Sequence, residues 1–304
     1  MKMKTRTLYS LLLPLLLTAA CEDAGLQPVS GEERGTRLRI QVRNVDTEAL
    51  QVLVFDARTP KAIDAYYPAG SGEGGFETGT GSKIVACVVN GPDLSAVADF
   101  AGLTGWHYIP GEADDPASRP LSFCYEETRI SRTTTSLSLD ADLQIGRVAL
   151  LGVSNRLEGH QTIESLHVYL ANAAGDNLLG LDYLPTAVRL HPDGSTAPGT
   201  SASWTDQSLG ALAYGAAHTG PYYLYSCPTP PSWVPWLILS ARISGTDWYY
   251  SIPLARIEKG ISQEVSVTLR TLGEDVPCIE NEPGTYDLVH SPSAWVAIPS
   301  QEQI

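Results

Sequence analysis

Five cysteines are the residues of this sequence whose chemistry is easiest to assign. Cys21 directly follows an apolar N-terminal segment, which leaves four in the body of the chain. An even number of cysteines in an exported protein favours two disulfides, and four cysteines allow three connectivities. We favour Cys87–Cys124 and Cys227–Cys278, because this pairing keeps each bridge within one half of the chain. The alternative is four packed thiols, since Cys87 lies in the very apolar stretch IVACVV.

Other side chains with catalytic or metal-binding chemistry lack the spacing that such chemistry needs. No two of the six histidines stand three or four residues apart, and the sequence has no HExxH, CxxC or GxSxG motif. Gly70–Gly75 matches GxGxxG, but a turn-rich stretch follows it instead of a helix, so we interpret it as a loop. We therefore expect no catalytic residue, no metal and no cofactor, and we do not expect an enzyme.

The N-terminus has the features of a targeting segment. A basic start is followed by a 13-residue apolar run, Leu8 to Ala20, whereas a membrane span needs about 20 residues. Residues 1–20 therefore read as a signal peptide. The stretch LTAAC resembles a lipobox, which implies lipidation of Cys21, with ordinary secretion and cleavage after Ala20 as the alternative. Residues 21–35 form a polar tether without periodicity.

Charge and composition exclude several classes of protein. The formal net charge of −14 argues against nucleic acid as a partner, because such binding needs clustered Lys and Arg. An apolar fraction of 43% excludes a disordered chain. The 27 glycines and 21 prolines suit an all-β protein with many turns.

The body of the chain reads as strands. Alternating apolar residues predict strands over 36–44, 50–56, 83–90, 133–143, 146–155, 164–173, 220–227, 236–245, 246–255 and 263–272. Two of these runs, WLILSARI and DWYYSIPL, flank the glycine-containing turn SGT (244–246). This pattern predicts a β-hairpin. Residues 93–103 predict a short helix with Asp93 as its N-cap. The fold class is mainly β, with one or two short helices and a domain break near 140–146, which gives β-sandwich domains over 36–143 and 144–304.

Several stretches resemble one known family. They are LQVLVFDARTPKAID (50–64), GSKIVACVVNGPDL (81–94), ISRTTTSLSLDADLQIGRVALLGVSN (130–155) and the aromatic, proline-containing segment 222–277. Their order resembles the fimbrillin family of type V pili, the Bacteroidales-type lipoprotein pilins with their anchor and accessory subunits.

This resemblance implies two transthyretin-like, immunoglobulin-like β-sandwich domains and a precursor anchored in the outer membrane through a lipid such as palmitate on Cys21. It implies a structural subunit or membrane anchor of surface fimbriae that supports cell adhesion. The partners would be other fimbrial subunits, joined by β-strand addition, and a receptor on a host or bacterial surface.

In this family an Arg-specific protease removes the first strand, and a strand of the next subunit enters the vacated groove. Arg34, Arg37 and Arg39 are candidate cleavage sites, and a cut after Arg43 would release 36–43. Alternatively, these arginines form the solvent face of an uncut edge strand, as an anchor subunit would need. The tail 285–304 is either a donor strand or the last strand of its own sheet.

Aromatic residues gather late in the chain. Trp233 and Trp236 lie among prolines in PTPPSWVPW, and Trp295 lies in the tail. We consider these three tryptophans candidate partner contacts, with core packing as the alternative. Trp233 and Trp236, together with Trp204, suggest a platform on which sugar rings could stack. The second candidate function is therefore an outer-membrane surface glycan-binding lipoprotein. A secreted hydrolase is the third and has no identifiable nucleophile.

Overall fold

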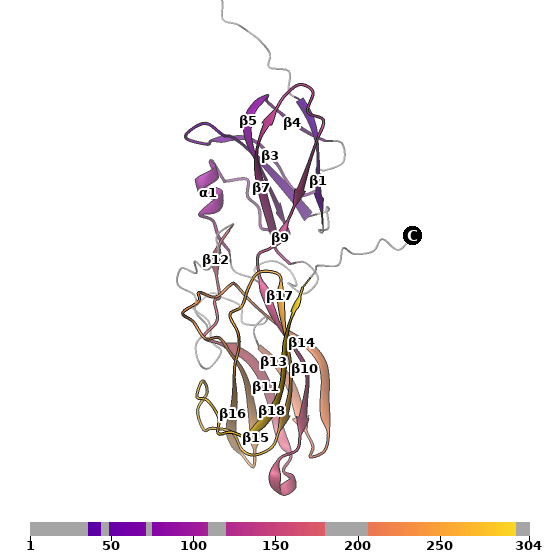
Figure 1. Ribbon diagram of the computed structural model, residues 1–304, viewed down its shortest axis with the longest axis vertical. Coiled ribbons are helices and arrows are strands. Elements are labelled where there is room, and N and C mark those ends of the chain that lie inside the picture. Colours follow the sequence, from indigo (N-terminus) through magenta and orange to yellow (C-terminus); the bar gives the residue numbers. More distant parts are fainter. Residues whose placement is uncertain (1–35, 44–48, 71–74, 109–119, 180–205, 296–304) are drawn as a thin grey trace, which may run out of the picture. The chain divides into compact units, whose positions relative to one another are not determined.

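A computed structural model describes residues 36–43, 49–70, 75–108, 120–179 and 206–295 (Figure 1). The predicted signal peptide, the tether and Cys21 lie outside the described residues, as does the tail from residue 296. All described residues belong to one compact unit. The fold is mainly β, as predicted. No helix in the described ranges is long and apolar enough to cross a membrane.

Apart from one two-residue strand described below, the strands up to residue 143 form two sheets. The three-stranded sheet has the order β4 (Phe76–Thr78), β1 (Thr36–Arg43), β8 (Ser136–Asp140). The five-stranded sheet has the order β3 (Ile63–Tyr67), β2 (Leu50–Asp56), β5 (Gly81–Val89), β7 (Ser122–Ile130), β9 (Asp142–Leu143). Because β2 and β5 are apolar at consecutive positions, they are buried on both faces, which makes them the centre of this part of the fold.

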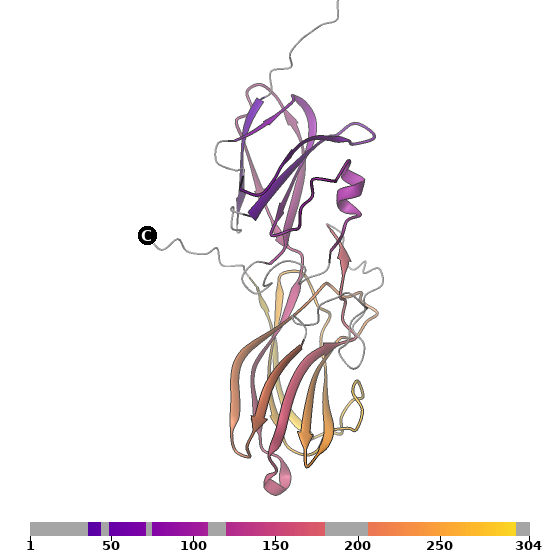
Figure 2. The ribbon, with the colours of Figure 1, turned by 180° about the vertical axis from the view of Figure 1, so that it is seen from behind.

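Apart from a second two-residue strand, the strands from residue 146 onward form two further sheets, seen from behind in Figure 2. One has the order β14 (Ala217–Ser226), β10 (Gly146–Asn155), β17 (Ile261–Leu269), β18 (Tyr286–Ala294). The other has the order β13 (Asp206–Leu212), β11 (Ile163–Ala171), β15 (Trp236–Ile243), β16 (Thr246–Pro253). Aliphatic side chains of both sheets pack into one hydrophobic cluster, as in a β-sandwich.

The predicted hairpin over 236–253 is confirmed. β15 and β16 pair from Trp236↔Pro253 to Ile243↔Thr246. Ser244 and Gly245 form the turn with φ of 53° and 78°. Two positive φ values are typical of the two-residue turns whose twist matches that of the flanking strands.

The short helix is displaced from its predicted position. α1 spans Phe100–Thr104, and the side chain of Asp99 caps it by accepting a hydrogen bond from the Gly102 amide at 2.7 Å. The prediction that Asp93 is the N-cap is therefore wrong. Asp93 instead accepts a hydrogen bond from the Ser95 amide at 2.9 Å and closes a local turn.

Three small elements complete the description. The strands β6 (His107–Tyr108) and β12 (Asn177–Leu178) pair antiparallel, and η2 (Glu158–His160) is one turn of 3-10 helix. The predicted boundary between residues 143 and 144 lies between β9 and β10, and among the described strands only the β6–β12 pair joins the two sides of it.

Candidate functional site

β1 alternates strictly between buried and exposed side chains. Leu38 is completely buried, while Ile40 and Val42 are 9% and 6% exposed. The arginines of the strand point to solvent: Arg37, Arg39 and Arg43. Since successive strand residues point to opposite faces, β1 covers an apolar surface with one face and displays cations on the other.

The apolar surface beneath β1 comes mainly from the five-stranded sheet. Its members share one hydrophobic cluster with Leu38, Ile40 and Val42 and are Leu50, Val52, Val54, Phe76, Val85, Cys87, Val89, Ile130 and Leu139. We call this set the floor, and we call the position that β1 occupies between β4 and β8 the β1 site.

β1 is the central strand of its sheet. It pairs antiparallel with β4 at three positions, Thr36↔Thr78 to Leu38↔Phe76. On its other side it pairs parallel with β8 at five positions, Arg39↔Ser136 to Arg43↔Asp140. Among the described strands, neither β4 nor β8 pairs with any other. The three-stranded sheet therefore exists only because β1 joins its two neighbours.

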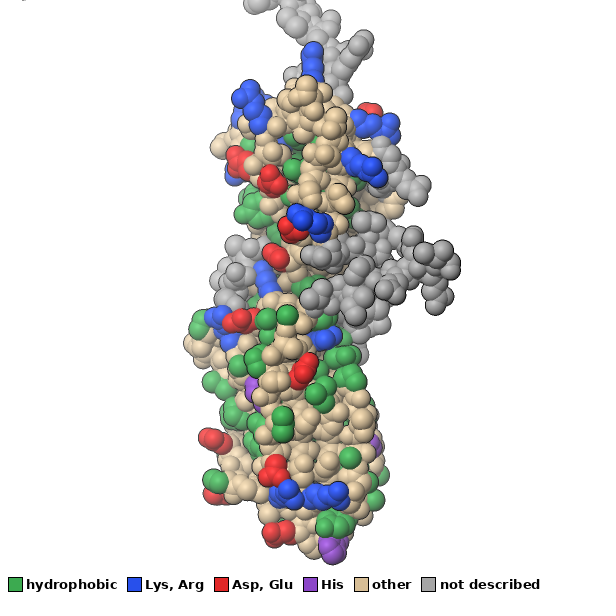
Figure 3. Space-filling view, turned by 45° about the vertical axis from the view of Figure 1, so that its right-hand side comes forward, with side chains coloured by type: hydrophobic (Ala, Val, Ile, Leu, Met, Phe, Trp, Pro, Cys, Tyr) green, Lys and Arg blue, Asp and Glu red, His purple; other side chains and the backbone are tan. Residues whose placement is uncertain are grey.

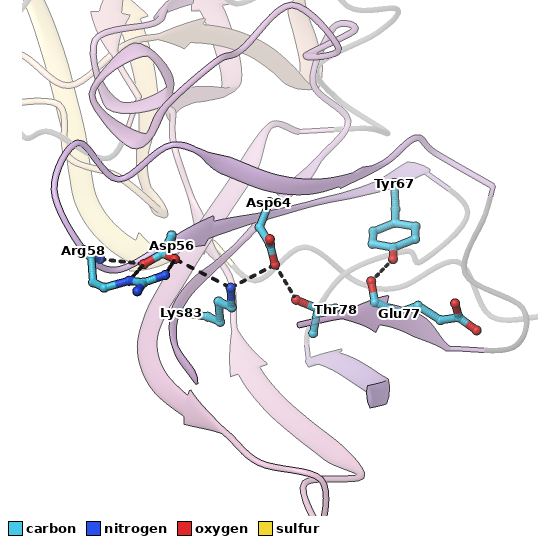
Figure 4. A network of polar contacts seen from close by, with 7 residues as sticks. All are labelled: Asp56, Arg58, Asp64, Tyr67, Glu77, Thr78 and Lys83. Carbon is cyan, nitrogen blue, oxygen red and sulfur yellow. Dashed lines mark hydrogen bonds and ion pairs between the residues drawn. The ribbon is translucent and has the colours of Figure 1, made fainter. Parts of the chain in front are cut away.

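β4 is also held by side chains, independently of β1 (Figure 4). Lys83 of β5 is buried, and its Nζ lies 3.0 Å from an Asp64 carboxylate oxygen and 4.0 Å from one of Asp56. Thr78 of β4 donates a hydrogen bond to the same Asp64 oxygen at 3.0 Å. The hydroxyl of Tyr67 donates to the Glu77 carbonyl. These contacts bind β4 to β3 and β5 of the five-stranded sheet.

A glycine sets how closely β4 approaches β1. Gly75 directly precedes β4 and has φ of +90°. A Cβ on this residue would lie 3.2 Å from Cγ of Arg37 and 3.3 Å from the carbonyl oxygen of Leu38. Glycine therefore meets two requirements at this position, a left-handed backbone and close contact with β1.

The β8 side of the β1 site carries an ion pair at its end. Nε of Arg43 lies 2.9 Å from an Asp140 carboxylate oxygen, and both side chains are exposed. An exposed pair contributes about 0–1 kcal/mol, so the backbone ladder and the floor, and not this pair, hold β1 against β8.

Three of the four predicted cleavage residues lie within β1, and Arg34 lies outside the described residues. A protease must bind an extended substrate, so the ladder on both sides of β1 protects bonds within the strand. Arg43 is the last residue of β1, and a cut after it would separate the complete strand from the rest of the chain. Whether these residues are cleaved stays a prediction.

The four described cysteines are free thiols. Cys87 and Cys124 lie directly opposite each other in the β5–β7 ladder, which is the neighbourhood that the favoured pairing requires. Cys227 and Cys278, in contrast, belong to different hydrophobic clusters. In this structure neither predicted pair is bonded, so both pairings stay predictions.

The three predicted partner contacts do not form one surface. Trp295 is only 6% exposed, and its ring packs 5.7 Å from that of Tyr225 and 4.7 Å from the Arg147 guanidinium. For Trp295 the described contacts therefore fit the alternative of core packing. Trp233 and Trp236 are half-buried and pack against different hydrophobic clusters. Trp204 lies outside the described residues.

The first part of the predicted tail is the last strand of its own sheet. β18 pairs antiparallel with β17 at nine positions, Ile261↔Ala294 to Leu269↔Tyr286. The Trp295 amide then donates to the Gly260 carbonyl at 2.7 Å. Of the two open alternatives for 285–304, the described part therefore fits the second.

Sequence reasoning missed two parts of the β1 site. β4 has only three residues and follows a glycine-rich stretch, and the alternation of Phe76, Glu77 and Thr78 was its only signal. Lys83 gave no signal of burial, because a lysine beside a glycine-rich turn is normally exposed.

Catalytic geometry is not evident in the described parts of the chain. There, no group of three or more His, Cys, Asp and Glu is placed to hold a metal ion. On the face seen in Figure 3, Lys and Arg side chains lie interspersed with Asp and Glu. The Arg58 side chain donates to Asp56 and holds the pKa of that carboxyl well below its usual range, so Asp56 is a stable anion beside Lys83.

Comparisons with known proteins identify the fold. No family model matches the chain, and no curated protein matches it. A "putative cell adhesion protein" from Bacteroides eggerthii superposes with a TM-score of 0.66 and 14% identity, covering 88% of this chain and 98% of that one. A second from Parabacteroides distasonis gives 0.60 and 12% identity, covering 86% and 99%. A fimbrilin from Porphyromonas gingivalis gives 0.59 and 10% identity, covering 86% and 99%. The chain therefore has the fold of the Bacteroidales fimbrilin and of these adhesion-type proteins.

Proposed function

We propose that this chain is a structural subunit or membrane anchor of bacterial surface fimbriae, and that the β1 site is where subunits join by strand addition. The observation that carries the proposal is the position of β1. It is paired on both sides with strands that have no other described ladder partner, and it covers an apolar floor. The shared fold with a fimbrilin supports the same reading.

The energetics of β1 make an empty site unfavourable. Burial of one Leu, Ile or Val side chain contributes about 1.5–3 kcal/mol, so the three apolar side chains of β1 contribute roughly 5–9 kcal/mol. This is comparable with the whole free energy of unfolding of a typical domain, about 5–15 kcal/mol. Loss of β1 would also leave unpaired backbone groups on β4 and β8. A trimmed chain should therefore bind any strand that restores both ladders and covers the floor.

The N-terminal features fit this scheme in two ways. Lipidation of Cys21 would attach the precursor to the outer membrane, because two or more acyl chains give stable anchoring. A cut after Arg34, Arg37, Arg39 or Arg43 would remove the lipid, and a cut after Arg43 would remove all of β1 with it. A subunit would be cut, whereas an anchor would keep both its lipid and β1. Neither role requires a catalytic residue, and in both the chain supports adhesion at the cell surface.

The test is assembly after trimming. Residues 22–304, which contain the whole compact unit, are treated with an Arg-specific protease, analysed on an unheated denaturing gel, and mapped by mass spectrometry. A regular ladder of multimers with cleavage at one of the four arginines is the expected result for a subunit. The matched control replaces Arg34, Arg37, Arg39 and Arg43 by Lys, which keeps the charge and removes the cleavage sites.

Two outcomes contradict parts of the proposal. A chain that is cut after Arg43 and yet stays monomeric and stable contradicts strand addition at the β1 site. A chain that is cut at none of the four arginines and runs as a single band contradicts the subunit role, and the anchor role then requires a lipid mass on Cys21 in protein from its native membrane.

A further inference from the structure

Cys87 and Cys124 face each other in a regular ladder. The nine pairs between β5 and β7 run from Gly81↔Ile130 to Val89↔Ser122 without a register shift. Opposite residues of antiparallel strands point to the same face, with Cα atoms about 4.5–5.5 Å apart. Disulfides form at Cα separations of about 4.4–6.8 Å. The register therefore brings the two thiols within bonding reach without any movement of either strand.

Cys87 belongs to the floor of the β1 site, and Cys124 packs against that floor. Cys87 is completely buried in the cluster that also contains Leu38 of β1, and Cys124 is half-buried and packs against the same cluster. Val52 of β2 lies opposite Cys87 on its other side. A row of side chains thus crosses the floor from β2 through β5 to β7. The Cys124 thiol and burial raise the pKa of the Cys87 thiol, as expected for two thiols in contact.

The other two described cysteines provide an internal contrast. Cys227 is completely buried in the cluster that contains Tyr225 and Trp295. Cys278 is half-buried against Tyr169 and Ile238 in another cluster. Only one pair among the four described cysteines therefore has the register and the shared face that a disulfide needs.

We propose that Cys87 and Cys124 form a disulfide in the exported protein and that this bond crosslinks β5 and β7 across the floor of the β1 site. Formation of the bond follows from register and packing alone. Its role rests on the proposed function, because a crosslinked floor matters most when β1 is absent and the floor is uncovered.

The bond forms by exchange with an external disulfide, supplied by a thiol–disulfide oxidoreductase or by oxidised glutathione. Cys124 is the more exposed of the two residues, so its thiolate attacks first and forms a mixed disulfide, and one external thiolate leaves. The Cys87 thiolate then attacks Sγ of Cys124 and expels the second external thiolate. The two external thiolates take up the two protons that the cysteines lost. The cysteines are oxidised by two electrons, and the external disulfide is reduced by two.

The first experiment counts thiols. Residues 22–304 contain four cysteines; the reduced protein is equilibrated with oxidised glutathione, denatured, alkylated and digested. We expect two thiols to disappear and one crosslinked peptide pair to contain Cys87 and Cys124. The variant Cys227→Ser/Cys278→Ser should lose the same two thiols, and the matched variant Cys87→Ser/Cys124→Ser should lose none. Full alkylation of Cys87 and Cys124 in the native-sequence protein, or a link to another cysteine, would overturn the inference.

The second experiment tests the role of the bond in chain trimmed after Arg43. The oxidised and reduced forms are compared for resistance to chymotrypsin. Because a crosslink restricts the unfolded chain, the oxidised form should be cleaved at least about tenfold more slowly than the reduced form. Equal cleavage rates would overturn the role in the floor.

These tests can contradict the disulfide and strand addition independently of each other. Thiol counting uses the untrimmed chain, so it does not depend on strand addition. If the Cys87–Cys124 peptide is present but trimmed chains never form multimers, strand addition is wrong and the disulfide stands.

Discussion

At the scale of single residues, Leu38 is the side chain of β1 with the deepest burial, and it should dominate the stability that β1 contributes. Leu38→Ala should lower the free energy of unfolding of residues 22–304 by about 2–5 kcal/mol, since it leaves a cavity in a packed cluster. The neighbouring Arg39→Ala should change it by less than about 0.5 kcal/mol, because Arg39 is exposed. Urea unfolding monitored by fluorescence measures both, and equal losses would contradict the assigned register of β1.

Lys83 is the second residue that a single substitution can test. Lys83→Met keeps a long apolar stem but leaves Asp64 without its cation, and we expect a loss of about 1–2 kcal/mol. The loss stays small because the Asp64 side chain is 33% exposed and water still solvates it. Adding Asp64→Asn should recover part of the loss, since removing both partners leaves no unpaired charge. A double-mutant cycle measures this coupling, and zero coupling would show that the ion pair does not hold β4.

At the scale of elements, the contact between β4 and β1 can be separated from backbone strain. Gly75→Ala and Gly70→Ala both place a side chain at positive φ, +90° and +80° respectively, which costs about 1–2 kcal/mol in either case. Only the Cβ at position 75 would press against β1, whereas the one at position 70 meets nothing within 4 Å. Gly75→Ala should therefore be the more destabilising substitution in untrimmed protein.

The same pair of variants has a second expected outcome after trimming. When residues up to Arg43 are removed, the atoms that crowd position 75 leave with β1. The difference between the two variants in urea midpoint should then disappear. A difference that persists in trimmed chain would mean that Gly75 contacts something other than β1.

The elements differ in how well the sequence predicts them. The strict alternation of β1 and the two apolar runs around Ser244–Gly245 were sufficient to predict β1 and the β15–β16 hairpin, because both patterns are local in the sequence. β4 escaped prediction, since three residues carry too little periodicity and its place depends on pairing with β1. The helix was displaced because Asp93 and Asp99 are both acceptable caps by type, and tertiary packing decides between them.

The candidate site was predicted only in part for a related reason. The arginines of β1 and the apolar character of its inner face are visible in the sequence. The floor, the buried Lys83 and the Cys87–Cys124 register depend on which strands become neighbours. β7 contains Glu126 and Glu127 in its middle and did not read as a strand, so its partnership with β5 could not be inferred.

At the scale of the whole described unit, one hydrophobic cluster contains residues from both sides of the predicted domain boundary. Phe55, Ile84 and Phe123 come from the five-stranded sheet, whereas Tyr225 and Trp295 come from beyond residue 143. Leu143 and Ile145 flank the boundary itself and belong to the same cluster. The β6–β12 pair adds a backbone connection between the two parts. Sandwich domains joined only by a linker would have no such shared interior.

We therefore expect residues 22–304 to unfold in a single calorimetric transition, because loss of either pair of sheets would expose part of this cluster. Trp295→Ala should lower the unfolding free energy by about 3–5 kcal/mol, since its ring is buried against Tyr225 and Arg147. It should also separate the transition into two, because it weakens the contact that couples them. Hydrogen exchange measures the free energy at which backbone amides open. The amides of β5 and β15 should open at different free energies in the variant but at the same free energy in the parent protein. Two transitions in the parent would show that the sandwiches fold independently and that the shared cluster does not couple them.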